Sequence, residues 1–211
     1  MATIARIPVP GLRELKKQRT RATLIDVAIQ LCIDQGYENT TVEQIAAAAE
    51  VAPRTFSRYF SGKEAVIVAI YDEVADDVAA AFARQPLGIT HYEALARAHL
   101  ETFASEECGT STSFERIRLL LTIVNSAPAI GLAPFMFRAD GFHHGAVEVA
   151  AQRMGVSADD PSIRILFDTW AVVMGVACRG LGTPGSPPIE PDVVCDRIES
   201  VYALFTQLWT P

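Results

Sequence analysis

The chain has 211 residues, half of them apolar, and a formal net charge of −7. A chain of this length and composition can bury a sizeable core in one or two domains. It contains no run of eighteen uncharged apolar residues and no signal-peptide-like N-terminus. We therefore expect a soluble, cytoplasmic protein without membrane contact.

The first predicted helix runs from Gly11 to about Gln35, where Gly36 provides a C-terminal stop. Its first turns hold five basic residues: Arg13, Lys16, Lys17, Arg19 and Arg21. A solvated charged face is one interpretation of this cluster, and neutralisation of DNA phosphates is the other. Residues 1–63 hold nine Lys and Arg against six Asp and Glu, whereas residues 64–211 hold nine against nineteen. This asymmetry favours a basic, DNA-facing end on an acidic body.

Residues 40–63 predict two short helices joined by a three-residue turn. Thr41 and Gln44 have the spacing of a capping box, in which each side chain bonds to the other residue's backbone N–H. Residues 50–52 form the turn. The next helix is expected over residues 53–60, because proline suits the first helical position.

The second helix of this pair has two distinct faces. Phe56 and Phe60 are four residues apart and share the inner face. The opposite face carries Arg54, Thr55 and Arg58, with Ser57 at its edge. A short helix with buried phenylalanines and outward arginines is suited to the major groove, so the pattern predicts a helix-turn-helix.

Several anchors in this region match a known family in order and spacing. Residues 36–37, 41–46, 55–60 and 63–64 resemble the DNA-binding domain of the TetR family of bacterial transcriptional regulators. The sequence departs from the family pattern at three positions. Glu50 replaces a turn glycine, Ala52 replaces a frequent capping serine, and Ser57 replaces an aromatic residue that commonly touches DNA.

The remainder of the chain predicts helices only. Ser61 and Glu64 form a second capping-box pattern that opens a helix to about residue 84. Further helices are expected over residues 90–107, 112–125, 128–154 (with Gly and Pro interruptions), 161–180 and 192–209. We therefore predict an all-α fold of about nine helices. A three-helix DNA-binding domain (residues 1–62) precedes a helical bundle for ligand binding and dimerisation (residues 63–211).

The helices predicted over residues 161–180 and 192–209 are too apolar for an exposed surface. Part of this apolar surface belongs to the core, but the excess predicts a partner surface, most commonly that of a twofold dimer. The family resemblance also implies a four-helix interface from these two helices of each subunit. A homodimer would place two reading helices on palindromic operator DNA.

The family resemblance and residue chemistry together suggest DNA contacts. We assign Thr41, Tyr59 and Lys63 to phosphates, which position the protein on the duplex. Arg54, Thr55 and Arg58 are the candidates for base edges, with Ser57 as a further one.

The middle helices contain bulky apolar residues with Gly and Pro breaks among them. Ordinary core packing explains any one of these residues, but as a group they could line a cavity for a small apolar effector. The candidates are Phe103, Leu120, Met136, Phe137, Phe142, Trp170 and Met174. The resemblance implies that an effector in such a pocket releases DNA. Residues 11–14, 41–45 and 53–56 resemble a subgroup associated with acyl-CoA-like effectors.

Two alternatives to a ligand-responsive repressor remain open at this stage. One is a constitutive DNA-binding regulator or activator with a solid core. The other is an enzyme built on Asp140, His143 and His144. Adjacent helical residues point about 100° apart, so the two histidines are poorly placed to share one metal ion. We expect no enzyme, no cofactor and no metal site.

The four cysteines are Cys32, Cys108, Cys178 and Cys195. They lack both the paired spacing of a zinc site and the density of a disulfide scaffold. We interpret them as reduced, buried thiols.

Overall fold

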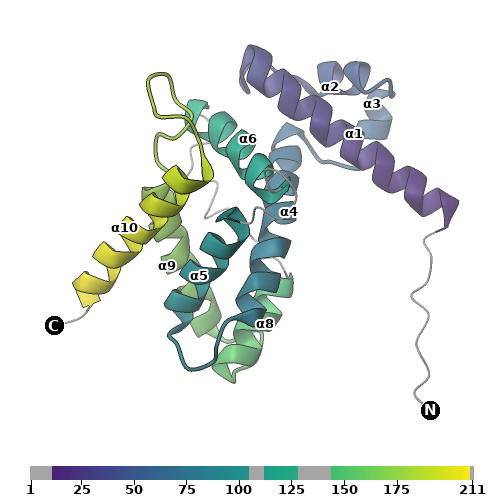
Figure 1. Ribbon diagram of the computed structural model, residues 1–211. Helices are drawn as coiled ribbons and strands as arrows, with labels where there is room; N and C mark the ends of the chain where they lie inside the picture. The colour runs from purple at the N-terminus through teal and green to yellow at the C-terminus, as the bar shows by residue number, and fades with distance from the viewer. Residues whose placement is uncertain (1–10, 105–111, 128–143, 210–211) are drawn as a thin grey trace.

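The computed structural model describes residues 11–104, 112–127 and 144–209, which form nine α-helices and no strand (Figure 1). The all-α prediction is confirmed. None of the described helices combines the length and apolarity needed to cross a bilayer. In chain order the helices are α1 (Leu12–Gln35), α2 (Val42–Ala48), α3 (Pro53–Phe56), α4 (Lys63–Arg84), α5 (His91–Ala104), α6 (Thr112–Ser126), α8 (His144–Met154), α9 (Pro161–Ala177) and α10 (Pro191–Trp209).

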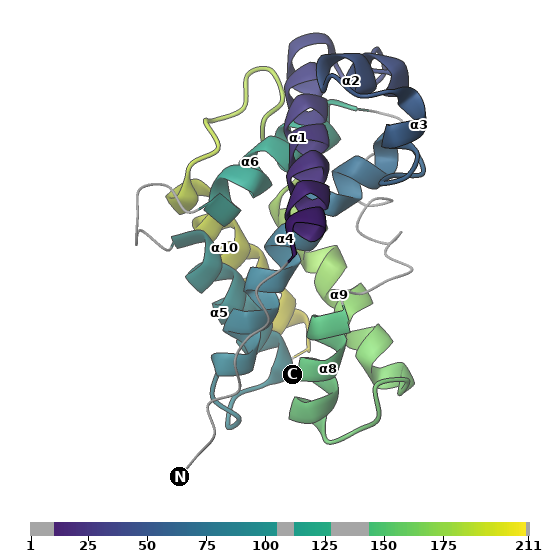
Figure 2. The same ribbon diagram turned by 90° about the vertical axis from the view of Figure 1, so that its right-hand side faces the viewer.

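Helices α1, α2 and α3 form an N-terminal unit at one end of the molecule (Figures 1 and 2). The long helix α1 buries a stripe with helical spacing, formed by Leu24, Ile25, Ala28, Ile29 and Cys32. It ends at Gly36, whose φ of 84° and ψ of 149° lie where only glycine is unstrained. The predicted stop of this helix is therefore confirmed.

Helix α4 leaves the N-terminal unit and runs into the bundle formed by the remaining helices. It packs against α1 near its start and against α5, α6 and α8 along its length. Helix α10 packs on both α5 and α9, which completes the bundle (Figure 2). The apolar side chains of both parts belong to one continuous buried cluster.

Helix α9 starts as the sequence predicts. The Asp160 carboxylate accepts a hydrogen bond from the Ser162 backbone N–H at 2.9 Å, and Pro161 occupies the first helical position. The Ser162 hydroxyl donates to the same carboxylate at 2.6 Å, and this bond, together with the backbone bond, holds the pKa of the Asp160 carboxyl below its usual value. Helix α9 ends at Ala177, slightly before the expected position near residue 180.

Two local predictions are wrong. The helix predicted over residues 53–60 is α-helical only over Pro53–Phe56, and residues 57–59 form a turn. The N–H groups of Tyr59 and Phe60 both donate to the Phe56 carbonyl, at 2.8 and 3.0 Å, so the chain tightens as it leaves the helix.

The second wrong prediction is the capping box at Ser61. The N-cap of α4 is Gly62, and no side chain caps it. Instead, the Lys63 ammonium donates to the carbonyls of Tyr37 and Thr40, at 2.7 and 2.9 Å. These contacts join the first residue of α4 to the loop after α1, and Ser61 lies outside the helix.

Candidate DNA-binding surface and ligand cavity

The capping box of α2 is formed as predicted. Thr41 Oγ1 accepts the Gln44 N–H at 3.2 Å, while Gln44 Oε1 accepts the Thr41 N–H at 2.9 Å. The Gln35 side-chain amide also donates to Gln44 Oε1, at 3.0 Å, and so joins the end of α1 to the start of α2. The Thr41 hydroxyl is an acceptor in its cap bond, so its hydrogen can still be donated to a DNA phosphate.

The turn after α2 is a Schellman motif. The Val51 N–H donates to the Ala46 carbonyl at 2.9 Å, and the Glu50 N–H donates to Ala47 at 3.0 Å. Glu50 adopts φ of 55°, the only positive φ at a non-glycine residue in the described ranges. The turn therefore keeps a conformation that favours glycine, at a cost of about 1 kcal/mol.

Helix α3 presents most of its predicted DNA contacts outward. Phe56 and Phe60 are buried, with ring centroids 5.7 Å apart. The outer side carries Arg54, Ser57 and Arg58, which are exposed, and Thr55, which is half-buried.

Tyr59 orders the Arg58 side chain. The guanidinium carbon of Arg58 lies 5.2 Å from the centroid of the half-buried Tyr59 ring, as in a cation–π contact. This stacking restricts the arginine and thereby reduces the entropy that it would lose on binding a base or a phosphate.

Lys63, predicted to bind a phosphate, already has partners within the protein. Besides the two carbonyls that it bonds, its ammonium lies 4.2 Å from the centroid of the Tyr37 ring. These partners lie more than twenty residues earlier in the chain, so local sequence patterns give no sign of them. A phosphate would compete with these contacts.

The basic cluster on α1 divides into two groups. Arg13, Lys16, Lys17 and Arg19 are exposed, and Lys16 and Arg19 line a groove beside the turn between α2 and α3. Arg21 instead lies 3.7 Å from the Glu73 carboxylate on α4, with its guanidinium 5.4 Å from the centroid of the Phe60 ring. Four of the five basic residues thus lie on the exposed surface of α1, and only Arg21 pairs with α4.

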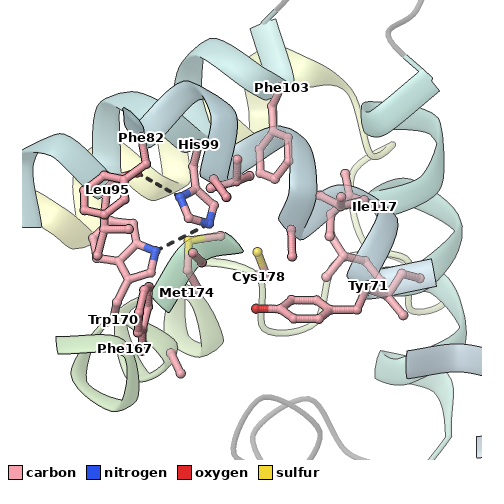
Figure 3. A pocket seen from close by; sticks show the side chains of 18 residues that line it. Tyr71, Phe82, Leu95, His99, Phe103, Ile117, Phe167, Trp170, Met174 and Cys178 are labelled. Carbon is pink, nitrogen blue, oxygen red and sulfur yellow. Dashed lines mark hydrogen bonds between the residues drawn. The ribbon is translucent and has the colours of Figure 1, made fainter. Parts of the chain in front are cut away.

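A cavity of about 90 Å³ lies between α4, α5, α6, α8 and α9 (Figure 3). Four residues predicted from the sequence line it: Phe103, Leu120, Trp170 and Met174. The other three predicted pocket residues, Met136, Phe137 and Phe142, lie outside the described residues. Helix α4 contributes Tyr71, Val74, Ala75, Val78, Ala79 and Phe82. The sequence did not predict this contribution, because the apolar spacing of α4 indicates which face is buried but not whether that face lines a cavity.

His99 is the most polar side chain in this lining. Its Nδ1 lies 2.8 Å from the Leu95 carbonyl oxygen, and the Trp170 indole N–H donates to its Nε2 at 3.4 Å. Burial lowers the pKa of His99 from 6.5 to about 4, although the bond to Leu95 opposes this effect. The imidazole is therefore neutral at physiological pH, with the proton on Nδ1 and the acceptor lone pair on Nε2.

The remaining polar groups of the lining are also uncharged. Burial raises the pKa of the Tyr71 hydroxyl and raises that of the Cys178 thiol to about 12. No Asp, Glu, Lys or Arg contributes to the described wall of the cavity. The site is suited to an apolar ligand that carries few polar groups.

A charged junction joins α6 to the N-terminal unit. The Arg116 guanidinium on α6 lies 3.0 Å from the Asp26 carboxylate on α1 and 3.3 Å from that of Glu73 on α4. Glu73 also pairs with Arg21. Three helices therefore meet at one partly buried arginine, and two of them, α4 and α6, line the cavity.

Helices α9 and α10 leave apolar side chains in water. Ile165, Val172 and Val176 form one stripe on α9, with exposed fractions of 63, 50 and 48%. Leu204 and Leu208 are 59 and 82% exposed and lie four residues apart on α10. We call these five residues the apolar stripes.

The described residues contain no group of three or more His, Cys, Asp and Glu side chains that could hold a metal ion. Asp140 and His143 lie outside them, and His144 begins α8. Cys32 and Cys178 are buried free thiols and Cys195 is a half-buried one, whereas Cys108 lies in an undescribed segment.

Comparison with known proteins supports a regulatory role. A family model for bacterial regulatory proteins of the tetR family matches residues 24–70, which run from the second half of α1 to the start of α4. The HTH-type transcriptional regulator TcmR of Streptomyces glaucescens is 35% identical over 153 residues, which cover 72% of this chain and 67% of that protein. An uncharacterized HTH-type regulator of Haemophilus influenzae is 33% identical over 64 residues, which cover 30% of this chain and 31% of that protein.

Two solved structures have the same fold. A TetR-family regulator of Syntrophomonas wolfei has a TM-score of 0.53 at 17% identity, covering 91% of this chain and 95% of that one. The TetR-family repressor FadR of Thermus thermophilus, crystallised with lauroyl-CoA, has a TM-score of 0.51 at 21% identity. That match covers 88% of this chain and 93% of FadR.

Proposed function

Because this chain belongs to the TetR family of bacterial transcriptional regulators and is not an enzyme, we propose that it is a ligand-responsive repressor. A homodimer would bind palindromic operator DNA and leave it when a small apolar effector binds. Residues 1–62 would bind DNA, and residues 63–211 would bind the effector and the second subunit. The observation that carries the proposal is the apolar cavity on α4, the helix that also leads to the DNA-binding unit.

Arg54 and Arg58 are the main candidates for base contacts. Both are exposed on or just after α3, and an arginine can donate two hydrogen bonds to one guanine. Thr55 and Ser57 would contribute at the edge of the same surface. Thr41 and Tyr59, with the exposed lysines and arginines of α1, would hold phosphates.

Lys63 takes a different role in this proposal. Its bonds to the carbonyls of Tyr37 and Thr40 fix the end of the α1–α2 loop against the start of α4. It therefore positions the DNA-binding surface, and any phosphate contact at Lys63 would be secondary.

The apolar stripes support dimerisation through α9 and α10. Five large apolar side chains on two adjacent helices lose hydrophobic free energy while they face water, and a second copy of the same surface would bury them. Two DNA-binding units at a fixed separation would then select an operator that one short helix cannot specify.

The proposed response to ligand is thermodynamic linkage. Tyr71, Val78 and Phe82 of α4 line the cavity, so a ligand that prefers one position of α4 changes the population of that position. The same helix packs against α1, while Arg116 joins α6 to both. Ligand binding would lower the affinity for DNA by the ratio of its affinities for the two states.

The apolar cavity favours this function over a constitutive regulator with a solid core. Acyl-CoA-like compounds are one candidate class of effector, since a repressor of the same fold was crystallised with lauroyl-CoA. The described cavity wall offers no cation for the phosphates of such a compound, so only its acyl chain would fit there.

The first experiment measures binding of the purified protein to the DNA flanking its own gene, at several salt concentrations. Arg54→Ala should reduce the preference for the specific site over random DNA by roughly 1–3 kcal/mol per half-site. Arg97→Ala, which removes an equally exposed arginine on α5, serves as the control and should leave binding unchanged. Equal losses of Arg54→Ala on specific and random DNA would mean that Arg54 contacts only phosphates. If the wild-type protein binds both DNAs equally and weakly, the proposal fails for that site.

A further inference from the structure

The cavity contains a hydrogen-bond acceptor that its protein partner uses poorly. Trp170 Nε1 and His99 Nε2 are 3.4 Å apart, whereas a well-formed N–H···N bond is several tenths of an ångström shorter. The opposite ring nitrogen, Nδ1, is firmly engaged by the Leu95 carbonyl at 2.8 Å. The imidazole is thus held in one orientation, and its Nε2 lone pair accepts only a weak bond (Figure 3).

Aromatic rings surround this acceptor. The centroids of the Trp170 and Phe103 rings lie 5.3 and 5.9 Å from that of His99. Phe167 on α9 and Phe82 and Tyr71 on α4 line the same cavity. Aromatic side chains bind the faces and edges of a ligand ring through offset and edge-to-face contacts.

Charge and size restrict the ligand further. A carboxylate or phosphate would be desolvated against a wall in which the described residues offer no cation, and its lone pairs would face that of Nε2. One water needs about 10–15 Å³ of such volume, so a cavity of about 90 Å³ has room for roughly six to nine waters or a ligand of that size. This size is that of a compound with one or two rings.

From these observations we infer that the cavity is selective for an uncharged aromatic compound bearing a hydroxyl group, which donates its hydrogen bond to His99 Nε2. This inference rests on the proposed ligand-responsive function and names the chemical class of the effector. The neutral imidazole is the specificity-determining group. The Trp170 indole competes weakly for the same lone pair, and the ligand hydroxyl displaces it.

The test compares three probes that share a ring system: 2-naphthol, naphthalene and 2-naphthoate. Each is titrated calorimetrically into the full-length protein. We expect 2-naphthol to bind about tenfold more tightly than naphthalene, the factor that one net hydrogen bond provides. Naphthoate should bind more weakly than both, because its carboxylate must be desolvated.

Two variants assign the effect to His99. His99→Phe keeps an aromatic ring but removes the acceptor, so 2-naphthol and naphthalene should bind equally. Trp170→Phe removes the competing donor, so the preference for 2-naphthol should increase. His91→Phe makes the same substitution at the first residue of α5, which does not line the cavity, and is the matched control; it should keep the wild-type ratio of the two affinities.

The inference would be overturned if no probe binds, or if naphthoate or lauroyl-CoA binds most tightly. It would also be overturned if His99→Phe still prefers 2-naphthol to naphthalene and Trp170→Phe shows the same preference as the wild-type protein. Adding the three probes, and separately lauroyl-CoA, to the protein–DNA complex separates this inference from the proposed function. Selective binding of 2-naphthol without any change in DNA affinity would support the ligand class and contradict the repressor mechanism. Release of DNA by lauroyl-CoA, with no release by the three ring probes, would support the repressor mechanism and contradict the ligand class.

Discussion

Acidification should destabilise this protein through His99. The imidazole is buried and neutral in the folded chain, with its pKa lowered from 6.5 to about 4. Between those values the unfolded chain binds a proton at this site and the folded chain does not. The unfolded state therefore gains stability as the pH falls. A difference of about 2.5 pKa units corresponds to about 3 kcal/mol, all of it present above pH 6.5 and lost as the pH approaches 4.

The assay is chemical denaturation in steps from pH 7.5 to pH 4.5, for the wild-type protein and for His99→Gln at one fixed protein concentration. Glutamine keeps a polar side chain but has no proton to gain, and the carboxyl groups titrate in both proteins. The difference between their free energies of unfolding isolates the histidine. This difference should stay constant above pH 7. On acidification to pH 4.5, the wild-type protein should lose about 2–3 kcal/mol of its free energy of unfolding relative to His99→Gln. A difference that stays constant over the whole range would mean that His99 gains its proton in the folded state, and the argument from burial would be wrong.

Four other substitutions test separate contacts. Thr41→Ala should cost about 1 kcal/mol in the free energy of unfolding, measured in urea, because it removes the cap of α2. Glu50→Gly should stabilise the protein by up to about 1 kcal/mol, seen as a higher Tm, since φ of 55° suits glycine; a lower Tm would show that the unfolded-state entropy of glycine dominates. Arg153→Met should cost roughly 1–3 kcal/mol, because the guanidinium bonds three carbonyls within residues 82–86 at the end of α4. Val176→Asp should shift the protein towards the monomer in size-exclusion chromatography; elution as an unchanged dimer would exclude α9 from the interface.

The sequence predicted the features that neighbouring residues determine. The glycine at residue 36 ends α1 through its own backbone conformation, and the Thr41–Gln44 pair starts α2 through bonds within four residues. These signals act before any tertiary contact forms, so they can be recognised without the fold.

The features that sequence reasoning missed depend on distant contacts. Lys63 bonds carbonyls more than twenty residues earlier, and the capping box predicted at Ser61 does not form. Arg21 resembles its basic neighbours in sequence but pairs with Glu73. His99 follows an ordinary helical pattern, and only the approach of α9, with Trp170, makes it part of a cavity. Spacing along one helix contains no information about which other helix will face it.

Helix α4 is the element through which the cavity and the DNA-binding surface can influence each other. Its 22 residues extend about 33 Å without an internal break. Val66, Ile67 and Ile70 are buried in its first half, nearer α1, while Val78 and Phe82 line the cavity in its second half. Every backbone hydrogen bond inside a helix resists local bending, so a ligand that displaces the second half moves the first half as well. The Arg116 ion pairs oppose that movement because they hold α1 and α4 to α6. In the proposed mechanism, an effector must therefore bind the moved state tightly enough to offset the loss of those contacts, and the strength of the Arg116 junction would set how much of the effector's binding free energy alters the affinity for DNA.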